Sequence, residues 1–183
     1  MRISLLSPSH TWRLSEMDEV HLALLRQAAG DALLGQTEEG RKRLYPRPIS
    51  EDEAVDEEEF LNDWHEFVSD ELEEKFTSDV KTLLDDLKQA SPMPSDGTPA
   101  ALAGRQYELT LPVGHGGAWF SALNQARLML DQHWHFHDEN DQFMINLPPI
   151  ELGKIDPQER MAAYLRYEIY CMIQEWLVHN VLE

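Results

Sequence analysis

Large apolar residues recur every three or four positions over much of the chain, which is the period of an α-helix and not of a strand. The longest such series lies in the middle of the sequence and consists of Phe60, Trp64, Phe67, Val68, Leu72, Phe76, Val80, Leu83, Leu84 and Leu87. One continuous helix over residues 51–89 would be about 60 Å long, which is more than the width of a domain of this size. We therefore predict a long helix with a break near Thr77 and Ser78.

Three other segments have a helical pattern. Ser15 has the position of a cap for a first helix over about residues 16–35, and another helix is expected to follow Gly117. The last helix has the clearest start, because Asp156 can cap it and Pro157 occupies its first position. Its body is apolar on several faces, as expected for a helix at the centre of a bundle.

Two shorter regions read as extended. The chain begins with short extended pieces on either side of Pro8, and apolar and polar residues alternate over 105–111. Isolated strands are not stable, so we expect these pieces to pair with one another. Polar residues, proline and glycine predict a connector over 36–50 and a Pro/Gly-rich loop over 90–104.

These elements predict a mainly all-α fold. The expected architecture is a four- to five-helix bundle with a minor β-ribbon from the N-terminus and residues 105–111. A chain of 183 residues falls within the usual size of one compact domain, so we assign residues 1–183 to a single helical domain.

The charge balance limits the partners of this domain. Lys and Arg number 15 against 34 Asp and Glu, which gives a net charge of -19. Such a surface repels phosphate backbones and anionic lipid headgroups, so neither nucleic acid nor a membrane is an expected partner. No apolar run is long enough to span a bilayer, and the single cysteine, Cys171, has no partner in the chain. We therefore predict a cytoplasmic protein without disulfides.

The most acidic part of the chain lies between Glu51 and Glu74, where 13 residues are Asp or Glu and none is Lys or Arg. A charge run of this kind usually forms a solvated helix face. The functional alternative is a docking site for a protein with a basic surface, in which charge speeds association. Under that alternative Glu57, Glu58 and Glu59 are candidate partner-binding residues.

A histidine-rich segment, with acidic residues after it, is the one candidate for a metal site. Imidazoles and carboxylates are ligands for zinc, iron or manganese, and His133, His135 and His137 would share one face if this segment were extended. The structural alternative is a solvated helix end, where histidine interacts favourably with the helix dipole. The glycine-rich residues 114–117 favour a flexible helix start over an anion site, because they lack the residues of a phosphate-binding loop.

Four polar residues lie beside the apolar stripes of the last two helices. They are Asn124, Arg127, Gln174 and Glu175. An ion pair between Arg127 and Glu175 would fix the register of two packed helices, and the alternative is that the group binds a ligand or a partner. No Ser-His-Asp or Cys-His signature occurs, so the sequence favours a non-enzymatic protein with no cofactor.

Three anchors resemble a bacterial family, the domain-of-unknown-function family 2017. The first is the run Leu24, Leu25 and Arg26. The second is a tryptophan followed by an Asn-x-x-Arg-Leu-x-Leu helix: Trp119, Asn124, Arg127, Leu128 and Leu130. The third is a closing Leu-Gln-Glu-x-Leu-Val pattern, matched here by Tyr167, Ile173, Gln174, Glu175, Leu177 and Val178.

The resemblance implies a helical fold and a cytoplasmic location. Genes of this family often lie beside the gene for ClpS, the adaptor that delivers substrates to the Clp protease. We therefore predict a non-enzymatic interaction or regulatory protein with an acidic docking surface, and the gene neighbourhood of the family suggests a link to Clp proteolysis. The alternative is a metal-dependent enzyme or sensor built on the histidine-rich segment. The sequence does not indicate the oligomeric state.

Overall fold

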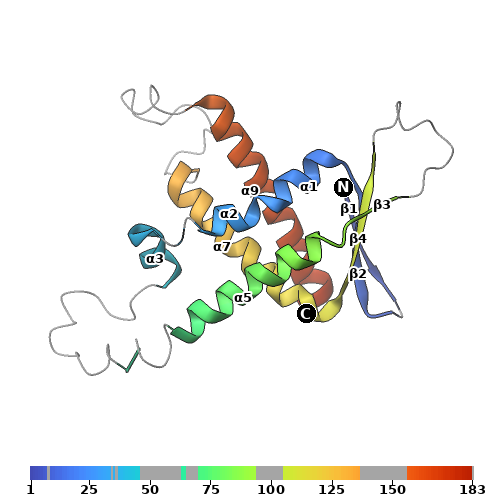
Figure 1. Cartoon of the computed structure of the whole chain (residues 1–183), viewed down its shortest axis with the longest axis horizontal. Coiled ribbons are helices and arrows are strands. Elements are labelled where there is room, and N and C mark those ends of the chain that lie inside the picture. The colour runs from blue at the N-terminus through green and yellow to red at the C-terminus, as the bar shows by residue number, and fades with distance from the viewer. Residues whose placement is uncertain are drawn as a thin grey trace.

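The computed structural model describes residues 1–7, 9–33, 35, 37–45, 63–64, 70–93, 105–136 and 156–182. These residues form a mainly helical structure with a small antiparallel sheet at one end (Figure 1). The predicted fold class is confirmed at this level, and a regular four- to five-helix bundle stays a prediction. None of the described helices combines the length and the apolar character that a membrane crossing requires.

The sheet has four strands in the order β1-β2-β4-β3, all antiparallel to their neighbours. Its strands are β1 (Arg2–Leu6), β2 (Thr11–Met17), β3 (Ser91–Pro92) and β4 (Tyr107–Pro112). The predicted pairing of the N-terminal ribbon with the strand near residue 107 is therefore confirmed. The short β3 lies within the predicted loop over 90–104, and most of that loop lies outside the described residues.

The first helical region differs from its prediction. Strand β2 continues to Met17, and Ser15 is buried within it. The prediction of a helix over 16–35 capped by Ser15 was therefore wrong. Helix α1 (Glu19–Arg26) is instead capped by Asp18, whose side chain accepts a hydrogen bond from the His21 backbone N–H at 2.9 Å. A second short helix, α2 (Ala28–Leu33), follows.

Two further predictions need correction. The expected connector over 36–50 contains a helix, α3 (Glu38–Leu44). The Thr37 hydroxyl caps this helix by accepting a hydrogen bond from the backbone N–H of Gly40. Helix α5 (Asp70–Leu87) passes through the expected break at Thr77 and Ser78 without interruption. Both residues are exposed, so their weaker helix propensity costs little there. The earlier part of the predicted long helix lies almost wholly outside the described residues.

The last two helices agree closely with their predicted starts. Helix α7 (Gly116–Trp134) follows a 3-10 turn at Val113–His115. Helix α9 (Pro157–Leu177) is capped by Asp156, whose carboxylate accepts the Gln158 backbone N–H at 2.8 Å. A π-helical turn, Val178–Leu182, extends its end.

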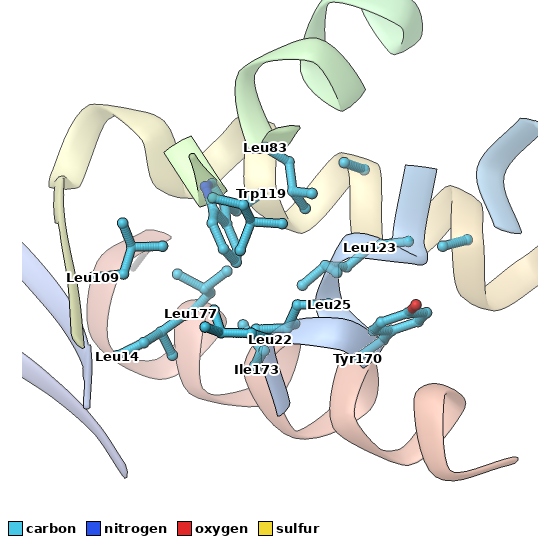
Figure 2. Packing of buried hydrophobic residues seen from close by; sticks show 14 of the residues in the cluster. Leu14, Leu22, Leu25, Leu83, Leu109, Trp119, Leu123, Tyr170, Ile173 and Leu177 are labelled. Atoms are coloured by element: carbon cyan, nitrogen blue, oxygen red, sulfur yellow. The ribbon is translucent and has the colours of Figure 1, made fainter. Parts of the chain in front are cut away.

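One hydrophobic core joins the sheet to the helices (Figure 2). Strands β2 and β4 contribute Leu14 and Leu109, and Trp119 and Leu123 come from α7. The remaining labelled side chains come from α1, α5 and α9: Leu22, Leu25, Leu83, Tyr170, Ile173 and Leu177. Because β2, β4, α1, α2, α5 and α7 all contribute buried residues to this core, the inner side of α9 is fixed on several elements at once.

Candidate functional site

Helix α9 has a buried apolar face and an exposed apolar face. Residues of the inner face are fully buried: Ala163, Tyr170, Ile173 and Leu177. On the other side Met161, Leu165 and Met172 are 42%, 50% and 43% exposed. Their spacing of four and seven residues places them in one stripe along the helix. The sequence predicted that this helix is apolar on several faces. In the structure one of these faces is buried and another is exposed to solvent.

Acidic residues accompany this stripe. Glu168 lies one turn from both Leu165 and Met172, and Glu175 lies one turn beyond Met172. Both glutamates are exposed. We call the set Met161, Leu165, Glu168, Met172 and Glu175 the α9 outer face. It combines three adaptable apolar side chains with two negative charges.

The arginines of α9 do not neutralise this face. Arg166 turns to α2 and donates two hydrogen bonds to Asp31, at 2.8 and 3.1 Å. Arg160 lies over the ring of Phe136 and donates to the backbone oxygen of Trp134 at 3.5 Å. The positive charges of the helix are therefore engaged with the rest of the fold, and the outer face keeps its negative charge.

A buried polar cluster holds the inner side of α9 against α1 and α2. Asp31 is 6% exposed and receives the Arg166 guanidinium. The Tyr170 hydroxyl lies 2.9 Å from an Asp31 carboxylate oxygen and 3.1 Å from the Leu24 carbonyl, so it can donate its proton to either. Burial raises the pKa of Tyr170 well above its usual value, and the Asp31 charge raises it further. This cluster fixes the rotation of α9 and so determines which residues face outward.

Aromatic side chains fix the beginning of α9. Phe136 meets Tyr164 and Tyr167 edge-on, with ring centroids 5.6 and 5.5 Å apart. The Arg127 guanidinium lies 5.8 Å from the Tyr167 ring centroid. Burial, with a smaller contribution from Cys171, raises the pKa of Tyr167 to about 12. Tyr167 therefore stays neutral at physiological pH and packs as an aromatic residue.

The four polar residues predicted between α7 and α9 have different surroundings. Arg127 donates to Asn124 Oδ1 at 3.4 Å and to Cys171 Sγ at 3.5 Å. Gln174 is buried, and its side-chain amide donates to the Phe120 carbonyl at 3.0 Å. The helices pack together, but the predicted ion pair of Arg127 with Glu175 was wrong because Glu175 points to solvent. Only Glu175 of the four belongs to the outer face.

The predicted metal residues are only partly described. The ring of His133 is exposed and meets Trp134 edge-on, with centroids 5.0 Å apart. His135 ends α7 in a left-handed conformation with a φ of 49°. His137 lies outside the described residues, as do Glu57, Glu58 and Glu59. Within the described ranges no three His, Cys, Asp or Glu side chains are arranged to hold a metal ion, and the metal site stays a prediction.

A second buried carboxylate joins α5 to the start of α7. Asp86 is 2% exposed, and it accepts the indole N–H of Trp119 at 2.8 Å. The Nδ1 atom of His115 lies 2.9 Å from the same carboxylate oxygen. The adjacent Gly116 is closely packed, because a Cβ there would lie 2.5 Å from Val181. Within the glycine-rich segment, Gly116 is therefore a tight packing point, whereas a Cβ at Gly114 or Gly117 would meet no atom within 4 Å.

One hollow lies between α2, α3, α5 and α7. Its volume is about 90 Å³, whereas pockets for small molecules usually measure about 300–1,000 Å³. At its rim Arg41 makes a bidentate ion pair with Glu73, at 2.8 and 2.9 Å. The hydrogen bonds from Arg41 lower the pKa of Glu73. A small hollow with an ion pair at its rim suits helix packing better than ligand binding.

These features define a mainly helical domain with a small antiparallel sheet and an exposed apolar and acidic helix face. The chain belongs to the family described as domain of unknown function (DUF2017), whose family model matches residues 8–181. The family predicted from the three sequence anchors is therefore confirmed. No curated protein and no solved structure is significantly similar to the chain.

Proposed function

We propose that this chain is a non-enzymatic interaction or regulatory protein that binds a partner protein through the α9 outer face. The observation that supports this proposal is the solvent exposure of Met161, Leu165 and Met172 on a helix whose inner side is firmly held. Exposed apolar residues in one stripe are typical of a surface that another molecule covers. The partner carries an apolar segment flanked by Lys or Arg.

The apolar residues and the glutamates of the α9 outer face contribute to binding in different ways. Full burial of a Met or Leu side chain is worth about 1.5–3 kcal/mol, and the unbranched methionines can adjust to the shape of the partner. Glu168 and Glu175 attract the basic residues and favour one orientation of the complex. The net charge of -19 acts in the same direction over a longer range and speeds encounter with a basic protein.

Two finer parts of the proposal come from the sequence. The predicted docking residues Glu57, Glu58 and Glu59 would extend the same negative potential. The family resemblance supports a cytoplasmic location and a functional link to Clp proteolysis. The first part concerns the negative potential and the second concerns where the partner is found, and the chemistry of the α9 outer face depends on neither.

The proposal is tested by charge reversal at the outer face. A tagged chain with Glu168→Lys and Glu175→Lys is compared with the wild type in affinity capture from cytosol at low and moderate salt. We expect the wild type to retain its partners at low salt. The amount of each partner that the variant captures should be at least tenfold lower. The partners are identified by mass spectrometry and then remeasured as purified proteins.

A matched control separates a local effect from a change in total charge. Glu38→Lys on α3 and Asp85→Lys on α5 change two exposed acidic residues by the same amount of charge, and both lie outside the acidic segment 51–74 and outside the α9 outer face. This control should keep most of the binding. Equal losses in both variants would mean that only the net charge matters, and unchanged binding in the α9 variant would rule out the outer face as the docking site.

A further inference from the structure

The two edges of the sheet differ in how they are protected. Strand β3 forms one edge, and it is only two residues long and ends in Pro92, which has no backbone N–H to offer. Strand β1 forms the other edge with five residues, and it contains no proline, lysine or acidic residue. Its pairing with β2 continues from Arg2 to Leu6 without a bulge. Proteins normally blunt a regular open edge of this kind, because it can pair with another strand.

The charge of the N-terminal hairpin also differs from that of the rest of the chain. Residues 1–15 contain Arg2 and Arg13 and no acidic residue, so their charge is +2. Subtracting +2 from the net charge of -19 leaves -21 for residues 16–183. Two copies of the chain therefore repel each other over most of their surface. The hairpin is the region with the fewest negative charges, so the electrostatic repulsion between two copies is weakest where their hairpins meet.

The sequence of β1 is self-complementary about Ser4. In an antiparallel pair centred on this residue, Ser4 faces Ser4 of the second copy, Ile3 faces Leu5, and Arg2 faces Leu6. Like charges directly opposite each other would destabilise such a pair, and this register contains none. Leu5 is 47% exposed and is in register with the buried Trp12, so it lies on the core side of the sheet. Cross-strand contact with Ile3 would cover it.

We propose that the β1 edge is a self-association site, at which β1 of a second copy adds in antiparallel orientation about Ser4. The two sheets then form one continuous sheet across a two-fold axis, an isologous interface in which the same residues meet from both sides. Backbone hydrogen bonds contribute the attraction, and the Ile3 and Leu5 contacts set the register. This site is separate from the α9 outer face and does not depend on the function proposed above.

The first test is the mass of the wild-type chain in solution. Sedimentation equilibrium at high micromolar concentration should give twice the monomer mass of 21.2 kDa. In parallel, hydrogen exchange should show that the β1 amides become more protected as the protein concentration rises. A wild-type mass of 21.2 kDa at all concentrations, with unchanged protection, would refute the proposal without any variant.

The register is tested with a pair of charge variants. Ser4→Lys and Ser4→Glu each place like charges opposite each other, so each variant alone should sediment as a monomer. Mixed in equal amounts, they should recover the dimer mass, because Lys then faces Glu. Ser9→Lys is the matched control, since Ser9 lies in the turn beyond β1 and this variant should stay dimeric. Circular dichroism checks that every variant is folded, and a dimeric Ser4→Lys variant would contradict pairing about Ser4.

Discussion

Asp31 and Asp86 are both buried carboxylates, with exposed fractions of 6% and 2%, but their charges are balanced in different ways. Asp31 is paired with Arg166, whose guanidinium is always charged and whose side chain is only 15% exposed. Asp86 is paired with His115, which carries charge only when protonated and whose side chain is 40% exposed. The Asp31 pair is thus enclosed, whereas the Asp86 pair has one side in water.

This difference indicates how strongly each pair constrains the fold. An enclosed pair is costly to break from one side, because the remaining charge has no water to replace its partner. At Asp86 the Trp119 N–H remains as a donor, and water can approach from the side of His115. We therefore expect the Asp31 pair to control the position of α9 more strictly than the Asp86 pair controls the start of α7.

The largest expected effect comes from removing the arginine of the enclosed pair. Arg166→Met leaves Asp31 buried with the Tyr170 hydroxyl as its remaining donor, and unfolding in urea should show a loss of about 3–5 kcal/mol. The double variant Asp31→Asn with Arg166→Met removes both charges and should recover more than half of this loss. A loss below about 1 kcal/mol in the single variant would mean that the pair is solvated in solution.

A smaller effect is expected at the half-exposed pair. His115→Ala removes one of two donors to Asp86, and the loss of unfolding free energy should be about 1–2 kcal/mol. His133→Ala is the matched control, because His133 is an exposed histidine near the other end of α7, and its effect should stay within about 0.5 kcal/mol. If His115→Ala cost as much as Arg166→Met, exposure would not be what distinguishes the two carboxylates.

The smallest effect at neutral pH is expected from the tyrosine beside Asp31. Tyr170→Phe removes one hydrogen bond, worth about 0.5–1.5 kcal/mol. The variant also changes the pH dependence. Because the folded pKa of Tyr170 is raised, the folded state holds its proton more tightly than the unfolded state, whose pKa is about 10. The stability of the wild type should therefore fall as pH rises above about 10.

The measurement for Tyr170 is a set of urea curves at increasing alkaline pH. Lysines titrate in the same range, so the informative quantity is the difference between wild type and Tyr170→Phe at each pH. That difference should shrink and then reverse above the unfolded pKa. Parallel curves for the two proteins would show that Tyr170 does not remain protonated in the fold.

Local signals in the sequence predicted a large part of this fold. Asp156 and Pro157 fixed the start of α9, and the alternation around Leu109 identified β4. These predictions succeeded because the determining interactions lie within a few residues. Ser15 misled because its hydroxyl fits a cap as well as a buried strand position. That choice depends on pairing with β1 and β4, which lie elsewhere in the chain.

The candidate site was only partly predictable for the same reason. Glu175 was selected as a partner-binding residue, and it belongs to the α9 outer face. The exposed stripe with Met172 was not recognised, because an apolar residue on a long helix reads as core until its neighbours are known. Asp31 follows Ala28 by three residues and lies on the same helix face, and this spacing could have indicated a buried charge. The partner of Asp31 could not be predicted in this way, because Arg166 is 135 residues away in the sequence.

The topology of the sheet has a consequence for synthesis on the ribosome. Strand β2 pairs with β4, whose last residue Pro112 lies about a hundred residues later in the chain. At about 5–20 residues per second, the apolar face of the nascent hairpin waits on the order of 5–20 seconds for that strand. Trp12 waits longer, because Trp176, one of its ring neighbours, lies still further along the chain than β4. We expect Trp12 and Leu14, which are buried in the folded chain, to present an apolar surface to chaperones beside the ribosome during this interval.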